Sequence, residues 1–254
     1  MADGSVLEVS GIQKWFFGLK ALDDISFSVR PGELLSIIGP NGSGKTTLFN
    51  VITGFLRPEA GRVRFRGQDI TAWPPHAIAL RGIARTFQDV RLFANLSVLD
   101  NLRLAVQQHQ EEDLIGRLLW SRKVRHCEEQ ANARAGELLG LVGLTAHGDA
   151  LAAHLSYGQR KLLEFAIGIM AEPDLLLLDE PAAAVNPTMI NTLKEYIVAY
   201  NRAGHTVILI EHNMEVVMDI SQRVLVLDSG QLIAEGRPAD VRQDPLVLEA
   251  YFGR

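Results

Sequence analysis

The residues of this chain best suited to bind phosphate form one run of eight, Gly39-Pro40-Asn41-Gly42-Ser43-Gly44-Lys45-Thr46. The run fits the P-loop pattern, because it follows the apolar residues 34–38 and precedes the helix-like residues 47–53. Its glycines let backbone N–H groups point at phosphate oxygens, and the start of the helix adds a partial positive charge. We expect Lys45 to reach the β- and γ-phosphates of ATP and Thr46 to ligate Mg²⁺, with Thr47 beside them.

Two adjacent acids end a second apolar run. Residues 175–178 are all leucine, and Asp179 and Glu180 follow them. An aspartate at the carboxyl end of a buried strand is placed to hold Mg²⁺ through water, opposite Thr46. Glu180 is then available to polarise the attacking water. The alternative for Glu180 is a helix-capping or surface acid.

A third motif, Leu155-Ser156-Tyr157-Gly158-Gln159, lies just before a segment with one apolar helical face. Ser156 and Gln159 have the spacing of a capping box, so the motif could serve only to begin a helix. A helix N-terminus with a serine hydroxyl and a glycine amide is also an anion site, and the two functions are compatible. Taken in order with the P-loop and the two acids, the motif resembles the signature of ATP-binding cassette (ABC) proteins.

This resemblance implies roles for three further residues. Gln88 matches the glutamine that ABC ATPases place between the catalytic core and a helical insert, where it senses Mg²⁺ and the attacking water. His212 follows the apolar residues 207–210 and matches the histidine that hydrogen-bonds the γ-phosphate. Phe16 aligns with the aromatic residue that stacks on adenine, and the neighbouring Trp15 is the alternative.

The resemblance also implies a head-to-tail dimer with two composite ATP sites. In each site, Ser156, Gly158 and Gln159 of one subunit contact the ATP held by the other subunit, which is a second copy or a related ATPase. Two residues depart from the family pattern. Tyr157 replaces the usual glycine of the signature. Asn186 replaces an aspartate in the loop after the catalytic glutamate, which puts a charge-based contact across the dimer in doubt.

Three longer stretches of the sequence indicate a particular subfamily of ABC ATPases. RTFQDVRLF at residues 85–93, DEPAA at 179–183 and DPLVLEAYFG at 244–253 are together similar to the larger ATPase subunit of branched-chain amino acid importers. Relatives that serve urea or other amides, other hydrophobic amino acids, or lipopolysaccharide export share much of this pattern and are the alternatives. The subfamily implies a peripheral subunit at the cytoplasmic face of the inner membrane. Its implied partners are integral-membrane permeases, a second ATPase and, indirectly, an extracytoplasmic solute-binding protein.

Short apolar runs and turn signals place the strands that would position these motifs. Strands are expected at residues 7–9, 25–29, 34–38, 63–65, 175–178, 207–210 and 224–227. Residues 98–106 have an apolar helical face, and residues 122–141 are rich in helix formers. With the resemblance, the predicted fold is α/β, a P-loop NTPase (RecA-like) core with an N-terminal antiparallel β-subdomain. Residues 1–88 and 159–254 form this core, and residues 89–158 form an inserted α-helical subdomain.

The insert also carries more apolar residues than a small subdomain readily buries. They lie at residues 92–104, 114–115 and 118–120. We expect some of them to face a groove for a cytoplasmic helix of a permease. The alternative is that all of them form the core of the insert itself.

Composition limits the classes of function. The chain has 254 residues, 47% hydrophobic and 22% charged, which fits a folded protein and excludes a disordered or fibrous one. A formal net charge of −5 disfavours a nucleic-acid partner, and a single cysteine excludes an intrachain disulfide. We expect the chain to begin inside the cell. It has no leader pattern and no stretch near the ~18 to 20 apolar residues of a membrane span.

Two other classes of ABC ATPase fit less well than a transporter motor. A DNA-repair or chromosome-organising ATPase should have a coiled coil, zinc-binding cysteines or a second domain. A ribosome-associated ABC protein normally has two cassettes in one chain. This chain has one P-loop and one signature, so the transporter motor is the favoured function.

Overall fold

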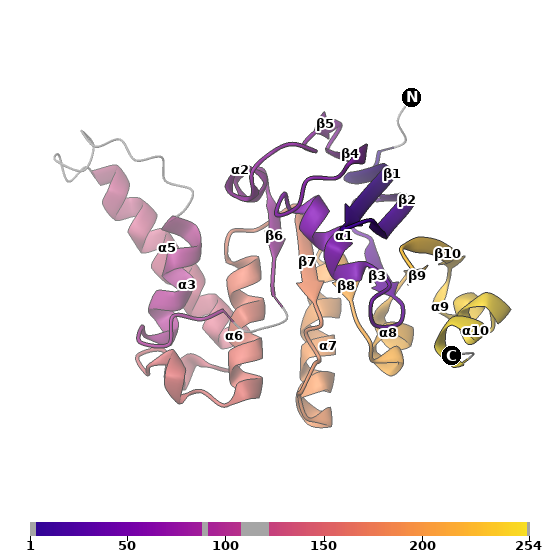
Figure 1. The fold of residues 1–254 in the computed structure, drawn as a ribbon. Coiled ribbons are helices and arrows are strands. Elements are labelled where there is room, and N and C mark those ends of the chain that lie inside the picture. The colour runs from indigo at the N-terminus through magenta and orange to yellow at the C-terminus, as the bar shows by residue number, and fades with distance from the viewer. Residues whose placement is uncertain (1–3, 88–90, 108–121, 253–254) are drawn as a thin grey trace. The chain divides into compact units, whose positions relative to one another are not determined.

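The computed structural model describes residues 4–87, 91–107 and 122–252. The chain divides into two compact units, Met1–Gln88 with Asp174–Arg254 and Asp89–Pro173 (Figure 1). The strands of the first unit are β1 (Leu7–Phe16), β2 (Leu19–Val29), β3 (Leu34–Ile38), β4 (Ala60–Phe65), β5 (Gln68–Asp69), β6 (Ile83–Arg85), β7 (Leu175–Asp179), β8 (Thr206–Ile210), β9 (Arg223–Asp228) and β10 (Gln231–Gly236). Its helices are α1 (Lys45–Ile52), α2 (Pro75–Leu80), α7 (Pro187–Arg202), α8 (Met214–Ile220), α9 (Pro238–Val241) and α10 (Pro245–Phe252). The second unit contains α3 (Val98–Gln107), α5 (Arg122–Leu141), α6 (Tyr157–Met170) and the 3₁₀ helices η1 (Thr145–His147) and η2 (Ala152–His154).

The larger sheet of the first unit has the strand order β10-β9-β3-β8-β7-β6. Its neighbouring strands are parallel, except that β9 and β10 are antiparallel. Every residue of β3, β7 and β8 is buried, as expected of parallel strands that are covered on both faces. The continuous apolar runs of these strands therefore predicted both their positions and their burial.

The smaller sheet is antiparallel and has the order β2-β1-β4-β5. Its first two strands form a hairpin in which Phe16 pairs with Leu19. Phe17 and Gly18 make the turn with φ values of 48° and 86°. Positive φ is uncommon for a residue other than glycine and is typical of tight hairpin turns. The hairpin therefore ends in exposed aromatic side chains, Trp15 to Phe17.

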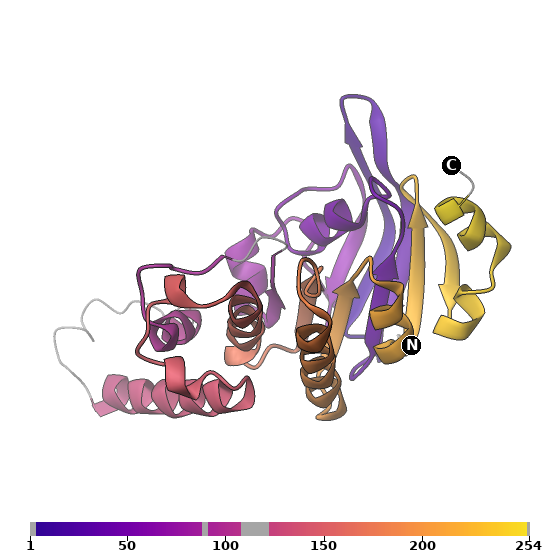
Figure 2. The same cartoon turned by 90° about the horizontal axis from the view of Figure 1, so that it is seen from below.

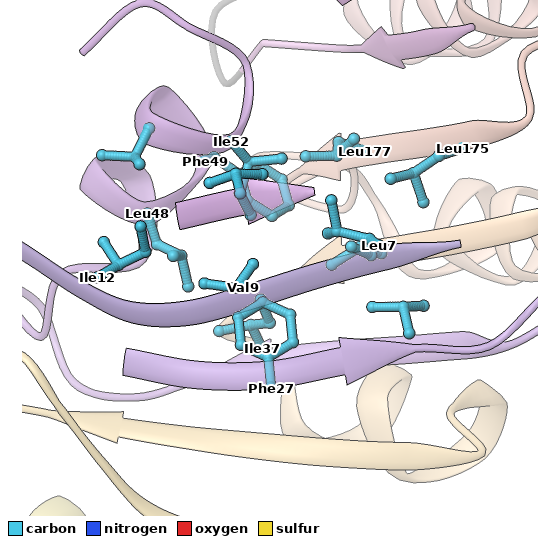
Figure 3. Packing of buried hydrophobic residues seen from close by; sticks show 14 of the residues in the cluster. Leu7, Val9, Ile12, Phe27, Ile37, Leu48, Phe49, Ile52, Leu175 and Leu177 are labelled. Carbon is cyan, nitrogen blue, oxygen red and sulfur yellow. The ribbon is translucent and has the colours of Figure 1, made fainter. Parts of the chain in front are cut away.

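One hydrophobic core joins the two sheets and α1. Figure 3 shows apolar side chains of β1, β2, β3, β7 and α1 pointing toward one another. Leu7 and Ile12 come from the antiparallel sheet, Phe49 from α1 and Leu177 from the parallel sheet, and all four are fully buried. Burial of a side chain of this size contributes ~1.5–3 kcal/mol. This core holds α1, and the loop before it, against both sheets.

A smaller apolar cluster joins the C-terminal helices to the large sheet. Ile38 of β3 and Val226 of β9 belong to it together with Val247 of α10, and the half-buried Tyr251 packs against it. Figure 2 shows α9 and α10, in yellow, beside the edge of the sheet, and both contact β10. The C-terminal helices thus pack against the strand that leads into the phosphate-binding loop.

The second unit is helical, with α3, α5 and α6 packed on one another. Their buried residues include Leu102, Leu138 and Leu163. The predicted helices at residues 98–106 and 122–141 agree with α3 and α5. The unit continues past residue 158, where the insert was expected to end, because α6 packs against α3 and α5.

The predicted α/β fold with an N-terminal antiparallel sheet is confirmed, and each expected strand lies within an observed one. Sequence analysis missed β5, β6 and β10. The first two have only two and three residues, and β10 is a partly exposed edge strand without a continuous apolar run. Within the described residues, no helix is long and apolar enough to cross a membrane.

Candidate functional site

The phosphate-binding loop runs from the end of β3 to the start of α1. Gly39 has φ 151°, and a Cβ atom there would lie 2.0 Å from the carbonyl oxygen of Leu227. Gly44 is the N-cap of α1 with φ 104°, and its Cβ would lie 2.5 Å from the carbonyl oxygen of Ala21. Only glycine fits both positions. Because Gly44 has no side chain to cap the helix, the first N–H groups of α1 suit an anion.

Lys45, the first residue of α1, is buried, and its ammonium group lies on the loop. Nζ donates to the carbonyl oxygens of Gly39 at 2.8 Å and Pro40 at 3.0 Å, and to Ser43 Oγ at 3.4 Å. Burial lowers the pKa of Lys45, and the carboxylates that end β7 act against this shift. A phosphate in the loop would give this cation charged acceptors in place of neutral ones.

The remaining loop residues leave one side of the turn open. The exposed residues are Asn41, Gly42 and Thr46, and the partly exposed ones are Pro40 and Thr47. The Thr46 hydroxyl group and the carboxylate of Asp179 are oxygen donors, the kind that Mg²⁺ prefers. Phosphate oxygens and water would supply the other ligands of such an ion, so the donor set fits Mg²⁺.

Asp179, the last residue of β7, is 2% exposed. Its Oδ2 accepts a hydrogen bond from Arg85 Nη2 at 2.8 Å, and its backbone N–H donates to Thr86 Oγ1 at 3.3 Å. Sequence analysis assigned Arg85 no role, although a charged residue three positions before the expected glutamine was a signal. Gln88 itself lies outside the described residues.

Glu180 and His212 meet at the ends of two neighbouring strands. β7 and β8 are paired, and the backbone N–H of Glu180 donates to the carbonyl oxygen of Ile210 at 2.9 Å. Glu180 Oε1 lies 2.7 Å from His212 Nε2. Glu180 has φ 48°, a value that is uncommon outside glycine and that often marks functional sites. Two of the three residues that were assigned to catalysis from the sequence, Glu180 and His212, therefore form one hydrogen-bonded pair.

Glu211 is a second residue that sequence analysis missed. Its buried carboxylate accepts backbone N–H groups from Ala182 at 2.7 Å, His212 at 3.1 Å and Asn213 at 3.3 Å. Burial raises the pKa of Glu211, and the three amides act against this shift. The carboxylate thereby joins the loop after Glu180 to the loop that carries His212. An acid at the end of an all-apolar strand was the available signal.

The aromatic candidates for adenine lie at the end of β1. Trp15 is 43% exposed and Phe16 is 40% exposed. Lys14 Nζ lies 5.5 Å from the centre of the Phe16 ring, within the range of a cation–π contact. Both rings are exposed at the same end of the hairpin, so Trp15 stays the alternative to Phe16.

In the second unit, Ser156 is the N-cap of α6. Its Oγ accepts the backbone N–H of Gln159 at 3.3 Å, and its own N–H donates to Gln159 Oε1 at 2.9 Å. The capping box is therefore present. Gln159 Nε2 also lies 2.8 Å from His147 Nε2. Ser156 and Tyr157 are exposed and Gly158 is partly exposed, so the start of α6 is open to solvent within its unit.

Asn186, one of the two departures from the family pattern, is the N-cap of α7. Its Oδ1 accepts the backbone N–H of Met189 at 2.9 Å, and Pro187 occupies the first helical position. Aspartate and asparagine both serve as helix N-caps. Asparagine at this position thus keeps a helix cap while it removes a charge.

Comparison with known families identifies the class of protein. A family model described as ABC transporter matches residues 22–183. A second, described as branched-chain amino acid ATP-binding cassette transporter, matches residues 231–254. The chain belongs to the ABC transporter family. It is an ATP-binding cassette, an ATPase whose hydrolysis of ATP is coupled to transport.

Similar curated proteins extend over nearly the whole chain. One is the high-affinity branched-chain amino acid transport ATP-binding protein BraF of Pseudomonas aeruginosa, 41% identical over 98% of both chains. Another is LivG of Escherichia coli K12, with the same description, 40% identical over 98% of both chains. A probable LivG of Archaeoglobus fulgidus is 38% identical over 98% of this chain and 95% of its own.

Solved structures agree with this assignment. A nucleotide-free ATP-binding cassette from an ABC transporter is 37% identical, with a TM-score of 0.85, over 98% of this chain and 100% of its own. The ADP conformation of an ATP-binding cassette of an ABC transporter is also 37% identical, with a TM-score of 0.85, over 99% of this chain and 100% of its own. The fold and the loop described above are therefore those of a nucleotide-binding protein.

Proposed function

We propose that the chain is the ATP-hydrolysing motor subunit of a bacterial importer for branched-chain or similar hydrophobic amino acids. The observation that carries this proposal is the C-terminal match over residues 231–254, because its family is described by that cargo. The names of the full-length relatives support it. The stretch at residues 244–253 falls within this match and contains all of α10 (Pro245–Phe252).

The proposed nucleotide site is built on the loop before α1. Gly39, Pro40, Asn41, Gly42, Ser43, Gly44, Lys45, Thr46 and Thr47 would hold the phosphates. Phe16, or alternatively Trp15, would stack on adenine. Thr46, Gln88 and, through water, Asp179 would hold Mg²⁺, which when bound neutralises charge on the phosphates. The buried Lys45 and its loop-held ammonium group support this assignment.

In the proposed hydrolysis, Glu180 accepts a proton from the attacking water as the water oxygen bonds to the γ-phosphorus. The bond to the bridging oxygen breaks, and ADP leaves with that oxygen. His212 donates a hydrogen bond to the γ-phosphate, and Gln88 helps to position the water. The contact of 2.7 Å between Glu180 and His212 supports a shared role, because it puts base and phosphate ligand side by side.

We further propose that each ATP is shared between two subunits. Ser156, Gly158 and Gln159 would contact the ATP of the partner, which is a second copy or a related, shorter ATPase. The exposed start of α6 supports this role, because its N–H groups and helix dipole suit an anion. ATP would then close the dimer, and hydrolysis would release it.

The solute path belongs to other subunits in this proposal. The chain would bind two different integral-membrane permeases at the cytoplasmic face of the inner membrane, and an extracytoplasmic solute-binding protein would act through them. No nucleic acid is a partner. Phe93, which is 62% exposed in the helical unit, is a candidate for the permease contact. The apolar residues 114–115 and 118–120 lie outside the described residues.

Affinity purification from detergent-solubilised membranes tests this assembly. A tagged chain should retain two integral-membrane subunits and a second ATPase. Phe93→Asp should reduce retention of the permeases, because it puts a charge into an apolar contact. Leu246→Asp is the matched control, since Leu246 is 56% exposed and lies in the other unit. Recovery of the chain with no membrane protein would contradict the proposal.

A further inference from the structure

Arg85, the last residue of β6, forms a buried ion pair with Asp179. Nη2 donates to Asp179 Oδ2 at 2.8 Å, and the two side chains are 6% and 3% exposed. Among the residues that the structure describes, none donates a hydrogen bond to Asp179 Oδ1. Within the described part of the chain, the protein therefore holds one oxygen of this carboxylate and gives the other no hydrogen bond.

The second terminal nitrogen of the guanidinium group, Nη1, contacts α1 and its C-cap. Nη1 donates to Asn50 Oδ1 at 2.7 Å and to Thr53 Oγ1 at 3.1 Å. The centre of the group lies 5.5 Å from the ring of Phe49 and 5.1 Å from the ring of Phe87. Two aromatic rings and three hydrogen bonds thus determine the orientation of one side chain.

Arg85 connects the elements that carry two of the proposed metal-binding residues. Thr46 lies in the first turn of α1, and Asp179 ends β7. Thr86 strengthens the link between β6 and β7, because its N–H donates to the carbonyl oxygen of Leu177 at 2.9 Å. A shift of any of these elements would change the hydrogen bonds of the same guanidinium group.

Stability alone does not account for this arrangement. A buried ion pair is often no more stabilising than apolar residues of the same volume, because two charges must leave water. Arg85 Nε is also buried, and it finds no acceptor among the described residues, which is unfavourable. A geometric role explains why a planar, forked cation is used where an apolar side chain would pack.

We propose that Arg85 is a positioning residue for the metal side of the nucleotide site. It holds Asp179 through Oδ2, so that Oδ1 would be available to water on Mg²⁺, and it ties α1, which carries Thr46, to β7, which ends at Asp179. This inference rests on the proposed function, because it assumes that Thr46 and Asp179 serve Mg²⁺. The role is one of support, since the hydrogen bonds of the Arg85 guanidinium group go to Asn50, Thr53 and Asp179.

Calorimetry with a non-hydrolysable ATP analogue, AMP-PNP, tests the proposal on the purified full chain. Each variant is titrated in EDTA and in excess Mg²⁺. In EDTA, Arg85→Met should bind the analogue with wild-type affinity, because the phosphate loop is intact. The factor by which Mg²⁺ increases the affinity should be about tenfold or more smaller in Arg85→Met than in the wild type. The Mg²⁺ concentration that gives half-maximal hydrolysis of ATP should be higher for Arg85→Met than for the wild type. Arg85→Lys should be intermediate, since it keeps the charge but not the fork.

Arg66→Met is the matched control. Arg66 Nη1 pairs with Asp174 Oδ2 at 2.6 Å, but both side chains are largely exposed, so the dependence on Mg²⁺ should not change. A wild-type Mg²⁺ effect in Arg85→Met would overturn the proposal. Equal loss of affinity in EDTA and in Mg²⁺ would also overturn it, because that result indicates a structural role. If Arg85→Met does not fold, the same criteria apply to Arg85→Lys.

The wild-type titration distinguishes an error in the proposed metal site from an error in the role of Arg85. If the wild-type chain binds AMP-PNP but gains nothing from Mg²⁺, the metal site of the proposed function is wrong, and this inference falls with it. If the wild-type chain gains affinity from Mg²⁺ and the Arg85 variants gain as much, only the inference about Arg85 is wrong.

Discussion

Replacement of Glu180 by glutamine should remove catalysis while it leaves nucleotide binding intact. The carboxylate is the proposed acceptor of the proton from water, and an amide cannot take that proton. Glu180 Oε1 lies 2.7 Å from His212 Nε2, and its side chain is 14% exposed. Because glutamine has the same shape and can hydrogen-bond histidine, the structure of the site should persist.

The size of the effect follows from the loss of a positioned base. Such a base contributes ~10²–10⁴-fold to the rate. Since each factor of ten corresponds to ~1.36 kcal/mol, the barrier should rise by about 2.7–5.4 kcal/mol. The hydrogen bond to His212 is worth about 1 kcal/mol and is mostly kept, so the free energy of unfolding should change by less than that.

Phosphate release by the purified chain measures the rate, and size-exclusion chromatography with ATP measures trapping of the dimer. Glu180→Gln should hydrolyse ATP at least ~10²-fold more slowly and should accumulate as an ATP-bound dimer. Glu195→Gln, an exposed change on α7, is the control and should behave as wild type. Near-normal hydrolysis by Glu180→Gln, with wild-type contamination excluded, would refute the catalytic role.

Other predictions concern the composite site, a helix cap and a buried carboxyl group. Ser156→Arg should leave ATP binding by the isolated subunit unchanged and abolish hydrolysis; an equal loss of monomer affinity would show that the loop serves its own subunit. Asn186→Ala removes the acceptor for the Met189 N–H and should lower Tm by ~2–4 °C for a loss of ~1 kcal/mol, whereas Asn186→Asp should not; equal melting of the two variants would argue against the cap. The raised pKa of Glu211 means that its stabilising effect is complete below pH 4.5 and is lost as pH rises through the folded-state value. The free energy of unfolding of Glu211→Gln, measured with denaturant, should therefore rise relative to that of the wild type as pH increases above 4.5. A relative fall over the same pH range would contradict this.

Much of the fold was predictable because its central strands are buried on both faces. The strands β3, β7 and β8 are almost entirely apolar, and α3 and α5 have the composition of helices. The short strand β6 gave no such signal, since three residues cannot establish a period. The pairing of β6 with β7 and of β8 with β7 depends on long-range packing, which no local pattern contains.

Some residues of the candidate site were also predictable from the sequence, and others were not. The loop at residues 39–46 and the acids Asp179 and Glu180 at the end of β7 form local patterns that are typical of phosphate and Mg²⁺ binding, so they were predictable from the sequence. Arg85 and Glu211 gain their importance only from neighbours on other strands and loops, such as Asp179 and Ala182. Such contacts become visible only when the sheet is assembled.

Uptake of labelled leucine measures the proposed importer function itself. In cells that carry Lys45→Ala in place of the wild-type chain, the loop loses the cation that would contact the β- and γ-phosphates. We expect these cells to lose uptake of leucine, isoleucine and valine, whereas cells with the exposed change Glu195→Gln should transport normally. If uptake of all three is unaffected while uptake of urea or an amide disappears, the chain is a transporter ATPase but the proposed cargo is wrong. If none of these uptakes changes, the importer assignment itself is contradicted.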